Sequence, residues 1–202
     1  MDKKFQLVIT GVGGQGILTV SDILGTAAIR DGLKAVMSEV HGMSQRGGIV
    51  ISEMKIGDFS APLIADHSAD AILSFEPAEA YRILRKAGRG TYVVTNLRPL
   101  LPAGALMGRE PYPDPALLIE NMKRAGLRAV GVPADDLAAE IGMRRAGNIV
   151  MLGALSAAEG FAVSLDSIRG VISDRFPKFA DKNVEAFEKG RAFALERFSE
   201  FS

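Results

Sequence analysis

The chain has 202 residues, enough for one large domain with a buried core, and its 48% hydrophobic and 24% charged residues are ordinary for a globular protein. It has 24 basic and 24 acidic side chains, so the formal charge is zero, which argues against broad nucleic-acid binding. Because there is no cysteine, disulfides, thiolate zinc sites and cysteine-ligated iron–sulfur clusters are excluded. No apolar run reaches the ~18 residues of a membrane span, and no signal-peptide core is visible, so we expect a cytoplasmic protein with no membrane partner.

The first half of the chain alternates strand and helix signals. Short apolar runs are typical of buried parallel strands, and apolar residues that recur every three or four positions are typical of helices. We expect strands over 5–10, 35–40, 49–56, 69–75 and 91–96, and helices over 17–30 and 77–86. Gly88 and Gly90 should end the second of these helices.

The second half begins with a loop over 98–115 that carries five prolines, with a short extended piece expected around 105–107. Beyond it we expect a helix over 116–125, a strand over 127–132, a helix over 134–141, and then only helices, over 148–160, 165–176 and 181–198. Ser164 and Asp166 are candidate N-caps. This order predicts a single α/β domain over residues 1–202: a Rossmann-like, doubly wound, mostly parallel sheet with a helical C-terminal third.

A glycine-rich turn follows the first predicted strand and opens the first predicted helix. Its residues are Gly11, Val12, Gly13, Gly14, Gln15 and Gly16. A turn of this kind aims free backbone N–H groups and the positive end of the helix dipole at one point, which suits a phosphate or carboxylate. The same glycines would also serve a close strand-to-helix crossover with no ligand, and both interpretations remain open.

A second glycine-rich segment follows the second predicted strand. It includes His41, Gly42 and Met43, and its candidate binding residues are Ser44, Gln45, Arg46, Gly47 and Gly48. Arg46 can make a two-pronged contact to phosphate or carboxylate, and paired glycines let the backbone come close to a neighbour. We expect this loop to share one crevice with the first turn. Glu39 lies near the position at which nucleotide-binding folds carry a ribose-binding acid, although a solvated strand end is the plainer interpretation.

Catalytic and metal-binding groups are not indicated. His41 and His67 have no partnered nucleophile and no acid at metal-ligand spacing, so we predict no catalytic residue and no metal site. Arg144 and Arg145 are interpreted as solvated rather than as phosphate ligands, and Asn148 opens an apolar helix with a face of small residues.

Several segments together resemble a known family. They are Gly11 to Thr19, Ser38 to Gly48, Arg145 to Ala154, Arg175 to Pro177 and Asn183 to Gly190. They resemble the gamma-type subunits of 2-oxoacid:ferredoxin oxidoreductases, and within them the beta subunits of the indolepyruvate type. The block His-Gly-Met-Ser-Gln-Arg-Gly-Gly over 41–48 is the most specific part of the resemblance.

The resemblance implies a subunit that supports oxidative decarboxylation of aryl pyruvates to aryl-acetyl-coenzyme A, with electrons passed to ferredoxin. Thiamine diphosphate, magnesium and the iron–sulfur clusters are then expected on a large catalytic alpha subunit, and this chain should not be active alone. Coenzyme A is the candidate ligand of the glycine-rich crevice, which could instead contact the partner. The isolated chain could form a homodimer. The alternative is a stand-alone NAD-, FAD- or coenzyme A-binding protein on a Rossmann-like fold.

Overall fold

The computed structural model describes the chain except for residues 1–3, 42–47, 102–104, 106, 110 and 202. The described residues form a six-stranded sheet in the order β2-β3-β1-β4-β5-β6. Its strands are β1 (Phe5–Val12), β2 (Ala35–His41), β3 (Ile49–Ile56), β4 (Ala69–Ser74), β5 (Ala87–Asn96) and β6 (Arg128–Val132). β3 runs antiparallel to both of its neighbours, whereas β1, β4, β5 and β6 pair in parallel.

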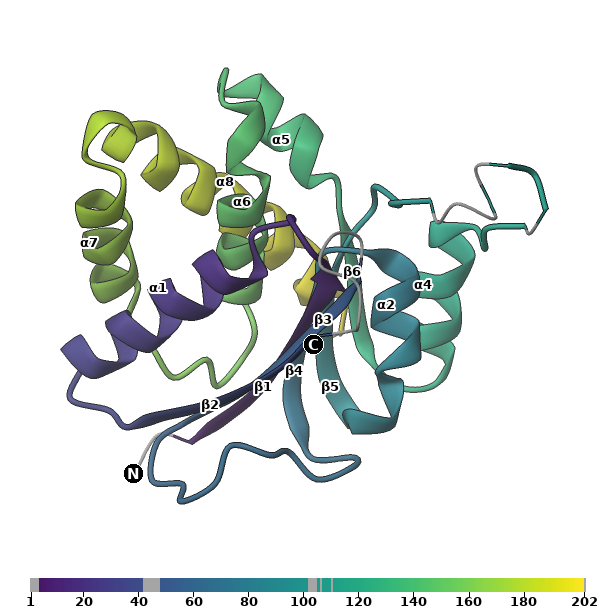
Figure 1. The fold of residues 1–202 in the computed structure, drawn as a ribbon, viewed down its shortest axis with the longest axis horizontal. Coiled ribbons are helices and arrows are strands. Elements are labelled where there is room, and N and C mark those ends of the chain that lie inside the picture. Colours follow the sequence, from purple (N-terminus) through teal and green to yellow (C-terminus); the bar gives the residue numbers. More distant parts are fainter. Residues whose placement is uncertain (1–3, 42–47, 102–104, 106, 110, 202) are drawn as a thin grey trace.

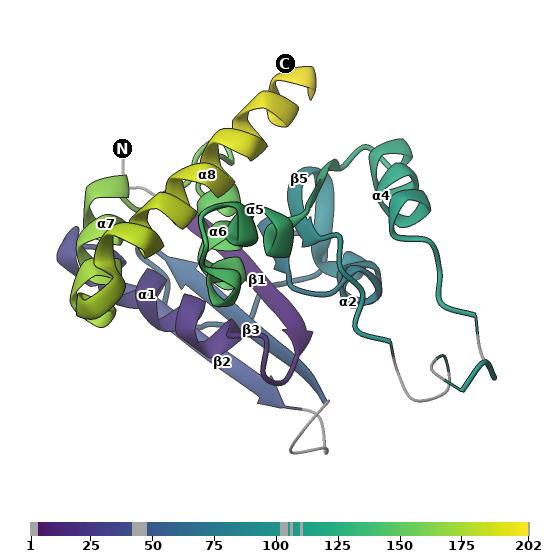
Figure 2. The ribbon, with the colours of Figure 1, turned by 90° about the horizontal axis from the view of Figure 1, so that it is seen from above.

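Helices cover the sheet on both sides (Figure 1). They are α1 (Ile17–Arg30), α2 (Pro77–Arg82), α4 (Pro115–Arg124), α5 (Ala134–Glu140), α6 (Gly147–Leu155), α7 (Leu165–Arg175) and α8 (Ala180–Phe198), with short 3-10 turns η1 (Leu84–Lys86), η2 (Arg144–Ala146), η3 (Pro177–Phe179) and η4 (Ser199–Phe201). α1 and the C-terminal helices pack on one face, and α2 and α4 pack on the other (Figure 2). The predicted α/β class with a mostly parallel sheet and a helical C-terminal third is therefore confirmed.

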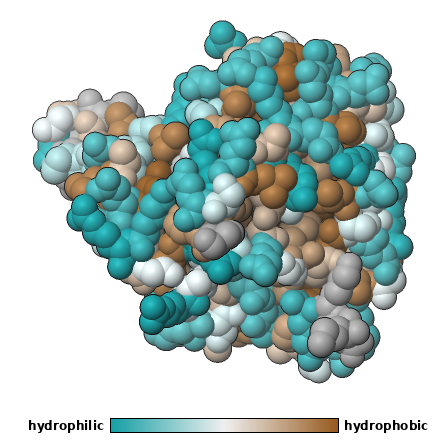
Figure 3. All heavy atoms as spheres, turned by 180° about the vertical axis from the view of Figure 1, so that it is seen from behind, coloured by the Kyte–Doolittle hydropathy of each residue, from teal (hydrophilic) through white to brown (hydrophobic). Residues whose placement is uncertain are grey.

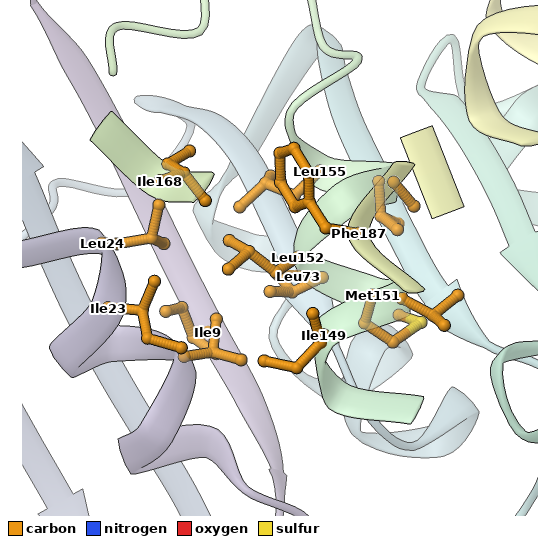
Figure 4. Packing of buried hydrophobic residues seen from close by; sticks show 14 of the residues in the cluster. Ile9, Ile23, Leu24, Leu73, Ile149, Met151, Leu152, Leu155, Ile168 and Phe187 are labelled. Atoms are coloured by element: carbon orange, nitrogen blue, oxygen red, sulfur yellow. The ribbon is translucent and has the colours of Figure 1, made fainter. Parts of the chain in front are cut away.

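The larger hydrophobic cluster lies between the sheet and the helices α1, α6, α7 and α8. In Figure 4, Ile9 of β1 and Leu73 of β4 lie among side chains from these helices, including Leu24, Leu152 and Phe187. Each of these five side chains is fully buried. Burial on this scale stabilises the fold by roughly 25 cal/mol per Å² of apolar surface removed from water.

Helix starts follow from local capping. Glu76 precedes α2 and its side chain accepts a hydrogen bond from the N–H of Glu79, with proline as the first helical residue. Asp114 caps α4 in the same way, and the predicted cap Ser164 accepts from the N–H of Ser167 at 3.2 Å. These side chains satisfy N–H groups that the first helical turn leaves without a backbone partner.

Several expected elements differ from the observed ones. β5 begins at Ala87, so Gly88 and Gly90 lie in a strand, because Ala87 pairs with Ala69 and the hydroxyl of Thr91 donates to the Ala69 carbonyl at 2.7 Å. α6 stops at Leu155 instead of continuing to residue 160. Of the extended piece expected at 105–107, Ala105 and Met107 do not lie in a strand, and the Ala105 carbonyl accepts a 3.0 Å bond from the Gly108 N–H.

The rear face of the molecule is largely hydrophilic, with hydrophobic residues gathered toward its centre (Figure 3). Among the described residues, no helix combines the length and the apolar character that crossing a membrane would require.

Candidate functional site

The glycine-rich turn lies between β1 and α1, at the carboxyl edge of the parallel strands (Figure 1). Gly14 and Gly16 have φ of 99° and 85°, a left-handed backbone that residues with a Cβ rarely adopt. Gly16 directly precedes the 14 residues of α1, and no side chain caps that end of the helix. The N–H groups of the first turn of α1 therefore face this edge without a side-chain acceptor, as an anion site requires.

Close packing accounts for the glycines at both ends of the motif. Gly11 lies inside β1, opposite Val50, and so does not form the turn as expected. A Cβ at Gly11 would lie 2.6 Å from Oε1 of Gln15, and a Cβ at Gly16 would lie 2.5 Å from Nδ2 of Asn148. Close packing between strand and helix is therefore sufficient to explain Gly11 and Gly16, and both interpretations of the turn stay open.

Gln15 braces the turn through its side-chain amide. Oε1 accepts a 2.7 Å hydrogen bond from the N–H of Val12, and Nε2 donates a 2.9 Å bond to the carbonyl of Phe75. The oxygen of the amide thus holds the turn to the end of β1, and its nitrogen holds the turn to the residue that follows β4. The structure gives the Gln15 side chain a positioning role in the turn.

The second glycine-rich segment reaches the first turn at its last residue. Gly13 donates its N–H to the carbonyl of Gly48 at 3.0 Å. This contact arises because β3 runs antiparallel to β1 and pairs Ile49 with Val12, so the start of β3 lies beside the end of β1. The candidate residues Ser44, Gln45, Arg46 and Gly47 lie outside the described residues.

Glu39 lies away from the turn. It is exposed on β2 and pairs with Ser52 of β3. In a dinucleotide-binding fold the second strand lies next to the first, but here β3 separates them. The sheet order therefore removes the geometric basis for a ribose-binding role of Glu39.

A crevice of about 340 Å³ opens where the β1–α1 turn faces the ends of β4, β5 and β6. It is lined by Gly14, Gln15, Gly16, Phe75, Asn96, Arg98, Pro99, Leu100, Asp135, Arg144, Arg145, Gly147 and Asn148. Ligands of open α/β sheets bind at such an edge, outside the carboxyl ends of the strands.

The crevice carries a basic excess. Arg98 contacts Asp135 at 3.3 Å, and the same carboxylate accepts a 3.3 Å bond from Nδ2 of Asn96. Arg144 and Arg145 are exposed, and within the described part of the chain no acidic side chain pairs with either. Two guanidinium groups thus remain available to an anion at the crevice.

The sequence pattern indicates neither the two arginines of η2 nor the polar residues opposite the turn as ligands. A signal existed for Asn96 and Asp135, because both follow predicted parallel strands, whose carboxyl ends meet at one edge. For Arg144 and Arg145 the sequence carries no such signal, since η2 follows a helix and its place is decided by packing.

His67 lies at the amino end of β4, away from the crevice. Its Nδ1 is 3.1 Å from the carbonyl of Ala87, and its backbone N–H donates to the backbone carbonyl of Arg85. Across the described residues, no group of three or more His, Asp or Glu side chains is placed to hold a metal ion.

A second cavity, of about 490 Å³, adjoins the crevice and shares Leu100 with it. We call it the apolar groove. It lies between the paired ends of β1 and β3, α2 and the segment that precedes α4, and is lined by Val12, Ile49, Glu76, Ala78, Glu79, Tyr81, Arg82, Leu100, Leu101, Ala105, Pro111, Tyr112, Pro113 and Leu118.

The polar residues that line the apolar groove contact one another. The hydroxyl of Tyr112 donates to Oε1 of Glu76, and burial together with this carboxylate raises the pKa of Tyr112. Burial also raises the pKa of Glu79, and the neighbouring Arg82 guanidinium, 2.5 Å from Oε1 of Glu79, opposes that rise. Tyr112 is thereby hydrogen-bonded to Glu76, the residue that caps α2.

Comparison with known proteins gives consistent results. Residues 6–193 match the family model of pyruvate ferredoxin/flavodoxin oxidoreductase. The chain is 42% identical over 201 residues to the indolepyruvate oxidoreductase subunit IorB of Thermococcus kodakarensis, covering 96% of this chain and 98% of that protein.

Solved structures share the fold. A keto/oxoacid ferredoxin oxidoreductase gamma subunit from Geobacter sulfurreducens superposes with a TM-score of 0.68 at 24% identity, covering 95% of this chain and 99% of that one. A 2-oxoglutarate:ferredoxin oxidoreductase from Magnetococcus marinus, with 2-oxoglutarate, coenzyme A and succinyl-CoA bound, gives 0.73 at 26% identity, covering 97% of this chain but 32% of that chain. The chain therefore belongs to the pyruvate ferredoxin/flavodoxin oxidoreductase family and is an oxidoreductase subunit of the same kind as these relatives.

Proposed function

We propose that this chain is the smaller subunit of a cytoplasmic indolepyruvate:ferredoxin oxidoreductase. The observation that carries the proposal is the 42% identity to an indolepyruvate oxidoreductase subunit over nearly the full length of both chains. The complex would decarboxylate aryl pyruvates oxidatively, form aryl-acetyl-coenzyme A and pass the electrons to ferredoxin.

The redox chemistry belongs to a larger partner chain. A chain without cysteine cannot ligate an iron–sulfur cluster through thiolates. Among the described residues that line the crevice and the apolar groove there is no serine, threonine or lysine to act as a nucleophile beside a base. Thiamine diphosphate, magnesium and the clusters are accordingly assigned to the partner, and this subunit supplies binding surfaces.

The crevice is proposed to hold the phosphates of coenzyme A. Its residues suit that group: the first-turn N–H groups of α1 lack a side-chain cap, the space beside Gly14 is open to a ligand, and Arg144 and Arg145 supply unpaired positive charge. Coenzyme A is named among the ligands of the Magnetococcus marinus relative. The competing use of the same residues is contact with the partner chain.

Calorimetric titration of the isolated subunit tests the ligand assignment. Coenzyme A should bind, and the double variant Arg144→Ala with Arg145→Ala should bind at least about tenfold more weakly, because each lost charge-assisted bond is worth about 1.5–3 kcal/mol. Arg89→Ala, an exposed arginine outside the crevice, is the matched control. Binding of NAD instead of coenzyme A would favour the stand-alone alternative, and no heat with either ligand would leave the partner-contact interpretation standing.

Co-purification from the native host tests the subunit assignment. A large iron–sulfur chain should accompany this one through the purification. Recovery as a lone, ligand-loaded monomer would contradict the assignment.

A further inference from the structure

The sheet ends at β2 in an open edge. Among the described residues, β2 pairs with β3 alone, and Figure 2 shows it as the outermost strand, with α1 alongside it. In an antiparallel strand, every second residue points its backbone N–H and C=O groups away from the paired neighbour. Such a row of backbone groups is a template for pairing with a further strand. The strand at the other end of the sheet, β6, is packed between α4 and α8.

Exposed apolar side chains lie along the β2 edge. Met37 and Val40 of β2 are 43% and 59% exposed, and Leu18 and Ile29 of α1 are 49% and 68% exposed. Edge strands that stay single are usually blocked by lysines, proline or a bulge. β2 has no lysine and no proline, its register with β3 is unbroken, and its one acidic side chain is Glu39. The edge is therefore suited to pairing rather than protected from it.

The exposed residues of α1 form a stripe on one face of the helix. Spacings of four, three and four residues bring together Leu18, Asp22, Gly25 and Ile29. Asp22, the charged member of the stripe, contacts Arg175 of α7. The ends of the stripe are apolar and its middle contains a glycine, a pattern against which a second helix can pack.

Contacts with β3 place this stripe above β2. A Cβ at Gly25 would lie 4.0 Å from Cε of Met54, and Met54 pairs with Met37 of β2. One helical turn earlier, the hydroxyl of Ser21 lies 3.4 Å from that of Ser52, which pairs two residues further along β2. The middle of the stripe therefore lies over the middle of β2.

The sequence of β2 matches a second copy of itself. Strands related by a two-fold axis pair antiparallel, and the same contacts are then made twice. An axis at Ser38, the middle residue, pairs all seven residues of β2 and places Val36 of each copy opposite Val40 of the other. An axis at Glu39 would instead place two carboxylates opposite each other, which is unfavourable.

The strand and the helix stripe share this axis. Because the middle of the stripe lies over the middle of β2, an axis at Ser38 also brings Leu18 of each copy toward Ile29 of the other. We propose that the chain forms a homodimer in which two β2 strands pair antiparallel about Ser38, so that one sheet continues through both copies. The match of the edge to itself favours a second copy over an unrelated strand.

The dimer leaves the ligand site accessible. No residue of β2 and none of the α1 stripe lines the crevice, so each copy keeps its own. The proposal therefore holds whichever ligand or larger chain the crevice binds, and it does not depend on the proposed function.

Sedimentation velocity of the full-length chain over a concentration series is the first test. The wild type should be a dimer, and Val40→Lys and Ile29→Lys should each weaken dimerisation at least about tenfold, because a lysine at the junction would lose water around its charge. Leu195→Lys on α8 is the matched control, because Leu195 is 46% exposed and lies away from β2 and α1. Circular dichroism melts verify that each variant is folded.

Disulfide trapping tests the register. The chain has no cysteine, so an introduced one is the only thiol. Opposite residues of an antiparallel pair have Cα atoms about 4.5–5.5 Å apart, within the range of a disulfide. Ser38→Cys should therefore give a covalent dimer under mild oxidation. Val36→Cys alone should not, because its two copies would lie about 13 Å apart along the strand. Mixed with Val40→Cys, it should form the covalent dimer.

Three results would overturn the proposal. The first is a wild-type chain that stays monomeric at every concentration. The second is a dimer that Val40→Lys leaves intact, or that Leu195→Lys weakens to the same extent. The third is a dimer in which Val36→Cys alone is trapped and Ser38→Cys is not, since the strands would then pair in another register or not at all.

Discussion

The packing of α6 against α8 allows a specific prediction of how one substitution changes the free energy of unfolding. Each of the two helices places a glycine against the backbone of the other. A Cβ at Gly153 on α6 would lie 1.9 Å from the carbonyl oxygen of Phe187, and a Cβ at Gly190 on α8 would lie 1.9 Å from the carbonyl oxygen of Val150. The obstructing atoms are backbone atoms, which cannot rotate away. In Gly153→Ala, the distance between the new Cβ and the carbonyl oxygen of Phe187 would have to increase from 1.9 Å to at least the 3.4 Å of ordinary contact.

The cost follows from the place of this crossing in the core. Val150, Leu152 and Phe187 are fully buried, so moving α8 away from α6 loosens the larger cluster. Overpacking a core costs about 1–3 kcal/mol and sometimes more, whereas alanine gains about 1 kcal/mol over glycine in helix propensity. With a rigid obstruction we take the upper end of this range, and expect Gly153→Ala to lower the free energy of unfolding by about 3 kcal/mol.

Urea unfolding followed by circular dichroism measures this change, with Gly25→Ala as the control. Gly25 lies within α1, and its added Cβ would meet only the flexible end of Met54, at 4.0 Å. The same substitution there should stabilise the chain by about 0.5–1 kcal/mol. If Gly153→Ala proves neutral or stabilising, the two helices do not pack through their glycines and the reasoning is refuted.

Two further perturbations test the site. Gln15→Ala should lower the free energy of unfolding by about 2 kcal/mol, because it leaves the N–H of Val12 and the carbonyl of Phe75 without this partner. Gln6→Ala removes one hydrogen bond, to the carbonyl of Ser68, and should lower the free energy of unfolding by about half as much in the same urea titration. Burial raises the pKa of Glu79 above its ordinary 4.5, so the folded chain holds this proton to higher pH than the unfolded chain and its stability falls as pH rises through that window. Glu79→Gln removes the effect, and its stability relative to the wild type should rise as the pH is raised above the ordinary 4.5 of this carboxyl. A pH-independent difference would contradict the raised pKa.

Much of the architecture follows from local patterns in the sequence. The predicted helix over 17–30 and strand over 49–56 match the observed elements at both ends. Their apolar periods and flanking glycines are short-range signals, and a short-range signal is sufficient where local preference and burial agree. The glycine-rich turn was located for the same reason.

The sheet order could be decided only by tertiary packing. Alternating strand and helix signals do not show that β3 inserts antiparallel between β1 and β2, which moves Glu39 away from the turn and brings Gly48 to it. The same holds for β5, whose start at Ala87 depends on pairing with β4, a contact that outweighs the local preference of Gly88 and Gly90.

The sequence by itself determined the class of fold, the absence of thiolate chemistry and the family of this chain. The tertiary structure alone decided which side chains meet: that Arg144 and Arg145 face the glycine-rich turn, and that Tyr81 and Leu100 form one groove with buried carboxylates. The physical reason is the distance along the sequence over which each kind of interaction acts. Periodicity and turn chemistry act over a few residues, whereas a binding surface depends on contacts between segments that only the packed core brings together.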